Sequence, residues 1–248
     1  MTKKSIKLLI SMLIIISITL PYKTVFALNM KEVKTDIYNH LINWDTEFEV
    51  SYDDDNDQDV IELILNSAAK DDYLKKSLIG LEVLTSRSKL KITAKYRTTK
   101  DQEKYISDEI DMIINSLINN NSSDYEKVKA INDYLVKRFE YDTNLQSNNA
   151  YLALTTNNTT CQGYSMVAYK MFEKAGIETR MSFGTLDNTP HGWNQVKVNG
   201  KWYNIDITNN DSTNSYKFFL KSDTTFMNIG FKQDSENSYE PCYEDYLY

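Results

Sequence analysis

The sequence predicts an α+β fold, in which a helix and an antiparallel β-hairpin build one domain that follows a smaller α/β unit. The helix is indicated by a polar loop at 155–160 followed by apolar residues at helical spacing over 164–175. The hairpin is indicated by Asn199-Gly200 between two alternating segments, because Asn-Gly is the preferred two-residue turn. The smaller unit is indicated by helical and alternating patterns that interchange over 28–120.

Residues 1–27 have the pattern of a secretory signal peptide. Three lysines precede an uncharged apolar run from Leu8 to Leu20, and Ala27 offers a cleavage site. The run is short for a membrane span, although an uncleaved N-terminal anchor is an alternative. We therefore expect a secreted or cell-surface associated protein with no stable membrane span after cleavage. The abundance of Lys, Asn and Ile favours a Gram-positive bacterium with an AT-rich genome as its source.

A polar break at 119–123 divides the remaining chain into an N-terminal α/β region over 28–120, of unknown role, and a second domain over 121–248. In the first region we expect helices over 28–45, 58–70 and 99–118 and strands over 46–52 and 89–97. In the second we expect helices over 124–139, 150–154 and 161–175 and strands over 178–183, 191–198 and 201–208.

The net charge of the chain argues against nucleic acid as a ligand. Cleavage after residue 27 would remove four lysines and no acids, leaving 24 basic and 35 acidic residues and a net charge of −11. Such an acidic chain is a poor partner for nucleic acid.

Asp53, Asp55 and Asp57 fit the first ligand positions of a calcium loop, but Gln58 and Ile64 replace the required glycine and glutamate. We therefore expect no metal and no cofactor.

Cys161 is the strongest candidate for a nucleophile. It lies where the predicted helix begins, and the partial positive charge of a helix N-terminus favours a thiolate over a thiol. Cys242 is the only other cysteine, so a Cys161–Cys242 disulfide is the structural alternative. A small buried side chain in the tyrosine-rich tail is the simpler interpretation of Cys242.

The hairpin predicts a partner pair for this cysteine. A two-residue loop fixes the register, so that Trp193 would face Asp206 and His191 would lie diagonally across from Asp206. The carboxylate could then accept a hydrogen bond from one ring nitrogen and leave the other for a thiol. His40, the other histidine, is expected to be structural or at the surface. Trp193 and Trp202 could line a substrate site, although packing is the commoner role.

Three separated motifs resemble the transglutaminase-like superfamily. They are Cys161-Gln162-Gly163-Tyr164, His191-Gly192-Trp193-Asn194 and Trp202-Tyr203-Asn204-Ile205-Asp206-Ile207-Thr208. The resemblance covers about 124–248 and implies a transglutaminase-like catalytic domain. It further implies a Cys161, His191, Asp206 triad on a papain-like core, with the cysteine helix packed on the antiparallel sheet that carries His and Asp. Three residues depart from the family pattern, which usually has Ala at Gly192, Trp at Asn209 and His at Asn132.

The resemblance implies thioester chemistry on a protein or peptide amide. Cys161 would attack the carbonyl, His191 would act as base and then acid, and water or an amine would take the acyl group. The expected function is therefore a secreted cysteine protease, amidase or transglutaminase. A non-catalytic surface-binding module on the same fold and a cell-wall peptide hydrolase are the alternatives. The sequence leaves open the substrate, the acyl acceptor, the state of Cys242 and the oligomeric state.

Overall fold

The chain forms two units that divide between Asp101 and Gln102. The boundary lies in the first turn of helix α4 (Lys100–Leu117), whereas the sequence placed it at the polar break 119–123. Glu109 of α4 pairs with Arg138 of α5 at 3.0 Å, which ties α4 to the second unit. The computed structural model describes residues 6–9, 30–52, 59–68, 71–86, 88–119, 121–234 and 239–247, so most of the expected signal peptide and the rejected calcium loop lie outside the described residues.

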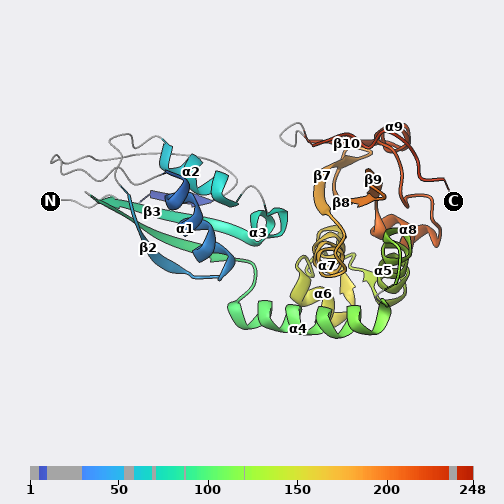
Figure 1. Cartoon of the computed structure of the whole chain (residues 1–248), viewed down its shortest axis with the longest axis horizontal. Coiled ribbons are helices and arrows are strands. Elements are labelled where there is room, and N and C mark those ends of the chain that lie inside the picture. The colour runs from blue at the N-terminus through green and yellow to red at the C-terminus, as the bar shows by residue number, and fades with distance from the viewer. Residues whose placement is uncertain are drawn as a thin grey trace. The chain divides into compact units, whose positions relative to one another are not determined.

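The N-terminal unit is a four-stranded antiparallel sheet with strand order β1-β3-β4-β2 and helices packed on it (Figure 1). Residues alternate along β4, where Leu90 and Ile92 are buried but Lys89 and Lys95 are exposed. The sequence did not predict α3 and β3. The elements are β1 (Ile6–Leu9), α1 (Met30–Ile42), β2 (Glu47–Ser51), α2 (Asp59–Ala68), α3 (Asp72–Ser77), β3 (Leu78–Ser86) and β4 (Lys89–Tyr96).

Three helices of the second unit, α5, α6 and α7, begin at the predicted residues, whereas α8 and α9 were not predicted. Helix α5 (Asp124–Arg138) starts with a capping box: Ser123 Oγ accepts the backbone N–H of Glu126, and the Glu126 carboxylate accepts the backbone N–H of Ser123 at 2.8 Å. Its buried face carries Val128, Ile131 and Leu135. The other helices are α6 (Ala150–Thr156), α7 (Cys161–Lys174), α8 (Ile207–Thr213) and α9 (Asp223–Ile229).

The second unit also contains an antiparallel sheet with strand order β10-β7-β8-β9, against which α7 packs (Figure 1). The residues after Val198 form the expected hairpin turn, with φ of 51° at Asn199 and 79° at Gly200. The predicted register is confirmed from Val198 opposite Lys201 to Asn194 opposite Ile205. The strands are β7 (Thr179–Leu186), β8 (Thr189–Val198), β9 (Lys201–Ile205) and β10 (Phe231–Gln233), and a short parallel pair joins β5 (Glu140–Tyr141) to β6 (Asn158–Thr159).

The predicted second hairpin strand over 201–208 is too long. Strand β9 ends at Ile205, and Asp206 is the N-cap of α8. The ladder stops there because the backbone N–H of Asp206 donates to the carbonyl of Phe218 at 3.0 Å instead of to β8. The expected pairing of Trp193 with Asp206 is therefore wrong.

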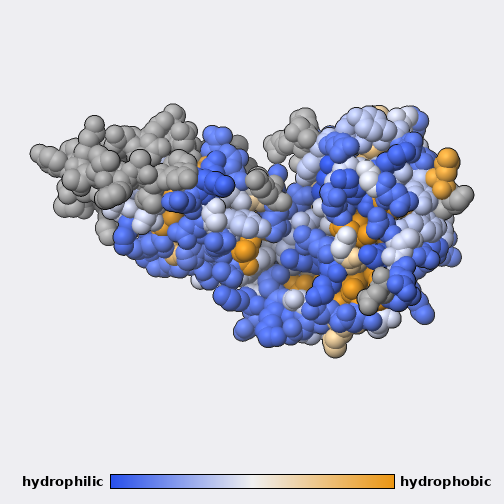
Figure 2. Space-filling view, in the orientation of Figure 1, coloured by the Kyte–Doolittle hydropathy of each residue, from blue (hydrophilic) through white to orange (hydrophobic). Residues whose placement is uncertain are grey.

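The described surface is largely hydrophilic, with apolar residues scattered in small patches on the face shown in Figure 2. This agrees with a chain in which 25% of residues are charged. No helix within the described ranges has the length and apolar character needed to cross a membrane.

Candidate active site

Cys161 is the first residue of α7, as the sequence predicts. Thr160 precedes it in an extended conformation, and within the described residues its side chain makes no capping hydrogen bond. The N–H groups of the first helical turn lack intrahelical partners, so they direct partial positive charge toward the sulfur. Gly163 allows this geometry, because a Cβ there would lie 1.9 Å from Thr159 Oγ1 in the preceding segment.

The loop before Cys161 is built around Asp142. Its carboxylate accepts three backbone N–H groups of the loop, at 2.9 Å from Asn144 and 2.8 Å from Gln146 and Ser147. The carbonyl of Ser147 in turn accepts the backbone N–H of Thr160 at 2.9 Å. Asp142 therefore holds the loop against the residue that precedes Cys161, a role that the sequence did not reveal.

His191 of β8 and Asp206 at the start of α8 lie side by side. His191 Nε2 is 2.8 Å from Asp206 Oδ2, and the two side chains are 11% and 1% exposed. Asp206 Oδ1 accepts the backbone N–H of Asn209 at 3.1 Å and so caps α8. Since Nε2 is engaged with Asp206, Nδ1 is the ring nitrogen left for the thiol. The two side chains meet through the helix cap and not through the strand ladder.

The Cys161 thiol interacts electrostatically with this pair. Burial alone would raise the pKa of Cys161, but the hydrogen bond and positive charge of His191 and the backbone N–H of Gly192 lower the pKa below its usual value. Burial likewise opposes the charged imidazole, but the hydrogen bonds and charges of Asp206 and Cys161 raise the pKa of His191 to about 10. The three predicted site residues are thus brought together, and both pKa shifts favour the charged thiolate–imidazolium form of the pair over the neutral form.

One hydrogen bond links α7 to β8, and one close contact links β8 to its neighbour β7. Asn194 Nδ2 donates to the carbonyl of Ser165 at 3.0 Å, in the buried interface between the helix and the strand. The Phe183 ring explains why position 192 is glycine where the family pattern usually has alanine. A Cβ at Gly192 would lie 2.9 Å from Cε1 of Phe183. The phenyl ring thus occupies the space that an alanine methyl group would need.

Trp193 and Trp202 pack against neighbouring side chains and do not line an open substrate site. Trp193 is buried, donates to Asn204 Oδ1 at 2.9 Å and lies nearly parallel to the His191 ring with centroids 6.3 Å apart. Trp202 covers the guanidinium of Arg180 at 4.0 Å. Trp193 therefore supports the imidazole from the sheet side.

Asn209 is a site residue that the sequence noted only as a departure from the family pattern. Its side-chain Nδ2 is 2.5 Å from Asp206 Oδ2 and 3.3 Å from His191 Nε2. The only signal in the sequence for this role was its position three residues after Asp206. A helix-capping side chain accepts the backbone N–H of the residue at that position.

The other cysteine and the other histidine lie apart from this site. Cys161 and Cys242, both among the described residues, are free thiols, and Cys242 is buried with its backbone N–H bonded to Asp223 at 2.9 Å. His40 lies in α1 of the N-terminal unit, where its Nδ1 is 2.7 Å from Asp45.

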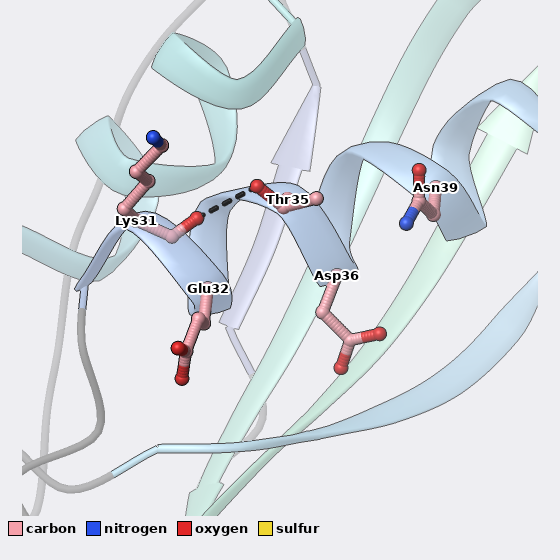
Figure 3. Close-up of a pocket in the computed structure, with 5 residues that line it drawn as sticks. All are labelled: Lys31, Glu32, Thr35, Asp36 and Asn39. Atoms are coloured by element: carbon pink, nitrogen blue, oxygen red, sulfur yellow. Dashed lines mark hydrogen bonds between the residues drawn. The ribbon is translucent and has the colours of Figure 1, made fainter.

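The pocket shown in Figure 3 belongs to α1 of the N-terminal unit. It contains none of the three predicted site residues. Among the residues that the structure describes, no group of three or more His, Cys, Asp or Glu side chains could hold a metal ion. The polar side chains that line the pocket are Lys31, Glu32, Thr35, Asp36 and Asn39.

Parts of the chain are similar to known proteins. The sequence model of the transglutaminase-like superfamily matches residues 111–207, which include all three site residues. The chain is 28% identical over 140 residues to kyphoscoliosis peptidase of Mus musculus, an alignment that covers 46% of this chain and 21% of that protein. The chain therefore spans about a fifth of this curated relative.

Solved structures are similar to parts of the chain. A crystal structure of a TGase has a TM-score of 0.43 and 20% identity, over 80% of this chain and 61% of the other. A candidate cysteine protease from Cytophaga hutchinsonii has a TM-score of 0.38 and 15% identity, over 52% and 57%. A candidate protease from Parabacteroides distasonis has a TM-score of 0.32 and 16% identity, over 48% and 28%.

A helix that begins at a cysteine and packs on an antiparallel sheet carrying a histidine gives the second unit the predicted α+β architecture. Residues 111–207 of this unit are similar to the transglutaminase-like superfamily.

Proposed function

We propose that the protein is a cysteine-dependent acyl-transfer enzyme acting on an amide of a protein or peptide. The observation that carries this proposal is the contact of His191 with both Asp206 and the Cys161 thiol at the start of α7. The raised pKa of His191 and the lowered pKa of Cys161 both favour the thiolate–imidazolium form of the pair, in which the sulfur is the nucleophile.

In the first half-reaction the Cys161 thiolate attacks the amide carbonyl carbon, and the C=O π electrons move to oxygen. Backbone N–H groups in the first turn of α7 would donate to this oxyanion. The His191 imidazolium then gives its proton to the departing amine nitrogen as the C–N bond breaks, leaving a thioester on Cys161 and a neutral imidazole.

In the second half-reaction the neutral His191 takes a proton from the acyl acceptor. If the acceptor is water, the product is a carboxylic acid and the enzyme is a protease or amidase. If it is an amine, the product is a new amide and the enzyme is a transglutaminase. In either case the acceptor attacks the thioester, and collapse of the intermediate returns Cys161 as a thiolate beside an imidazolium.

Alkylation by iodoacetamide tests the proposal. A thiol whose pKa is one unit lower holds about tenfold more thiolate at pH 6. We expect Cys161 to react faster than a free thiol such as glutathione at that pH, with Cys242→Ala as the matched control and Cys161→Ala as the blank. A rate for Cys161 equal to that of glutathione would count against the proposal.

The acyl acceptor and the substrate are addressed together by mass spectrometry. The protein is incubated with a peptide library and a free amine, and the masses of the products distinguish hydrolysis from transamidation. Release of peptides from purified peptidoglycan would instead identify a cell-wall peptide hydrolase. If Cys161→Ala retains every biological activity, the surface-binding alternative is favoured.

We also propose that the enzyme acts outside the cell, at the cell surface or as a secreted protein. The support is the lysine-rich start and the apolar run from Leu8 to Leu20. Cleavage after Ala27 would remove β1, which pairs with β3 from Gly80 to Val83. The mass of the exported protein from a Gram-positive host should correspond to a chain beginning at residue 28. An uncleaved chain retained in the cytosol would contradict export.

A further inference from the structure

The side chain of Asn209 touches the part of the site that holds the imidazole proton. Its Nδ2 lies 2.5 Å from Asp206 Oδ2, and His191 Nε2 lies 2.8 Å from the same oxygen. The two nitrogens are 3.3 Å apart. When the imidazole is protonated both nitrogens carry N–H groups, so neither can accept from the other, and both donate to the single carboxylate oxygen.

This shared oxygen has a definite electrostatic consequence. A second donor withdraws charge from the oxygen that stabilises the imidazolium, and the positive end of the amide N–H dipole lies beside the positive ring. Both effects weaken the hold of Asp206 on the imidazolium proton. The backbone N–H of Asn209 is separate from this, because it donates to Oδ1 at 3.1 Å and would remain in any substitution other than proline.

Few other groups around His191 can change its proton affinity. Cys161 of α7 and Asp206 before α8 are the titratable groups that act on it. The rings of Trp193 of β8 and Phe231 of β10 lie against it and carry no charge. Tyr141, at the end of β5, interacts with the thiol.

We propose that Asn209 is a positioning residue whose side-chain amide shares Asp206 Oδ2 with His191 and keeps the imidazolium acidic enough to protonate the leaving amine. This inference rests on the proposed function, because it assigns Asn209 a part in the proton transfer of that reaction. An imidazolium that holds its proton too tightly is a poor acid for an amide nitrogen at neutral pH. The amide of Asn209 thus offsets part of the effect of the buried carboxylate.

The test compares the wild type with Asn209→Leu, which has a similar volume but no donor. The matched control is Ser215→Ala, an exposed residue just after the same helix whose hydroxyl contacts Thr213 and Lys217. The chain has two histidines, so a ¹H NMR titration of the imidazole signals, assigned with His40→Gln, reports His191 directly. Alkylation of Cys161 across the pH range reports formation of the thiolate.

In Asn209→Leu the deprotonation of His191 should move up by roughly half a pH unit to one unit. The lower step, at which Cys161 becomes a thiolate, should stay in place, because the imidazolium is present on both sides of it. Turnover of an amide should fall by about three- to tenfold, while turnover of an activated ester, whose leaving group needs no proton, should change less. Ser215→Ala should behave as the wild type.

A purely structural role gives a different pattern. Loosening of the site would move the lower step up and the upper step down, and would slow amide and ester equally. That pattern, or an unchanged His191 titration in Asn209→Leu, overturns the inference. If the leucine variant does not fold, Asn209→Ala is measured under the same criteria. An ordinary thiol pKa for Cys161 in the wild type would instead count against the proposed function itself, so the two failures are distinguishable.

Discussion

Asp206 has two tasks in the structure, and the variants Asp206→Asn and Asp206→Ala separate them. One carboxylate oxygen caps α8 by accepting the N–H of Asn209 at 3.1 Å, and the other lies 2.8 Å from His191 Nε2. Asparagine caps a helix as well as aspartate does, whereas alanine loses about 1 kcal/mol of stabilisation. Only the aspartate carries the charge that stabilises the imidazolium.

Asp206→Asn should lower amide turnover strongly even though it keeps the cap. An asparagine amide nitrogen beside Nε2 favours the wrong tautomer of His191, and the same exchange in a serine-protease triad costs about 10⁴-fold in kcat. Burial of His191 opposes its charged form, so without the carboxylate its pKa should fall from about 10 toward or below the ordinary value. The thiolate at Cys161 then loses its counter-charge, and at pH 7 alkylation slows.

Three measurements check this reasoning: amide turnover, alkylation of Cys161 and urea unfolding. Both variants should lose about 10³-fold or more in turnover, and Asp206→Ala should be less stable than Asp206→Asn by about 1 kcal/mol. Asp108→Asn, an exposed carboxylate paired with Lys104, controls for the exchange of charge alone. Wild-type turnover in Asp206→Asn, or equal stability of the two variants, would refute the two-task assignment.

Three other features of the second unit give independent tests. A Cβ on Gly192 would lie 2.9 Å from Phe183, so Gly192→Ala should cost about 1–3 kcal/mol of unfolding free energy in the wild type and much less in a Phe183→Leu background. Equal costs in urea titrations of both backgrounds would rule out the clash. The raised pKa of His191 stabilises the fold fully below the unfolded pKa, and this contribution is lost as pH rises through about 10. The stability advantage of the wild type over His191→Gln should therefore shrink as pH rises from the unfolded pKa to about 10, and a constant difference over that range would contradict the linkage. Burial raises the pKa of Cys242, so peptide mass spectrometry after iodoacetamide treatment at neutral pH should find label on Cys161 and not on Cys242 in the folded protein.

Local signals in the sequence were sufficient for much of the second unit. The Asn199-Gly200 turn determines the strand register because it holds two positive φ angles, and the capping box places the start of α5. The sequence predicted the contact between His191 and Asp206, but it did so by extending the strand ladder past Ile205. The contact is present and the extension of the ladder is wrong. The acid instead leaves the strand to cap α8, a change that the alternation of residues cannot indicate.

Other features depended on contacts that no local pattern records. In β3 the apolar residues Leu78, Leu81 and Val83 do not alternate strictly, since the register shifts between Leu78 and Gly80, and the strand follows directly on α3. Asn209 lies in a polar run without periodicity, so its contact with His191 depends on where α8 is packed. Such placements come from tertiary packing and not from the spacing of residues along the chain.

The site joins two short-range structures through one longer-range contact. Asp206 is held by the cap of α8, three residues away, and Cys161 is held by the loop that Asp142 organises. The distance between α7 and β8 depends instead on packing, with Asn194 bonded to the carbonyl of Ser165 as its polar link. Because a displacement of about 1 Å at a reacting centre can cost roughly 100-fold in rate, activity should depend more on this interface than on either local structure. The packed interface between α7 and β8 is therefore what brings the Cys161 thiol next to the His191–Asp206 pair.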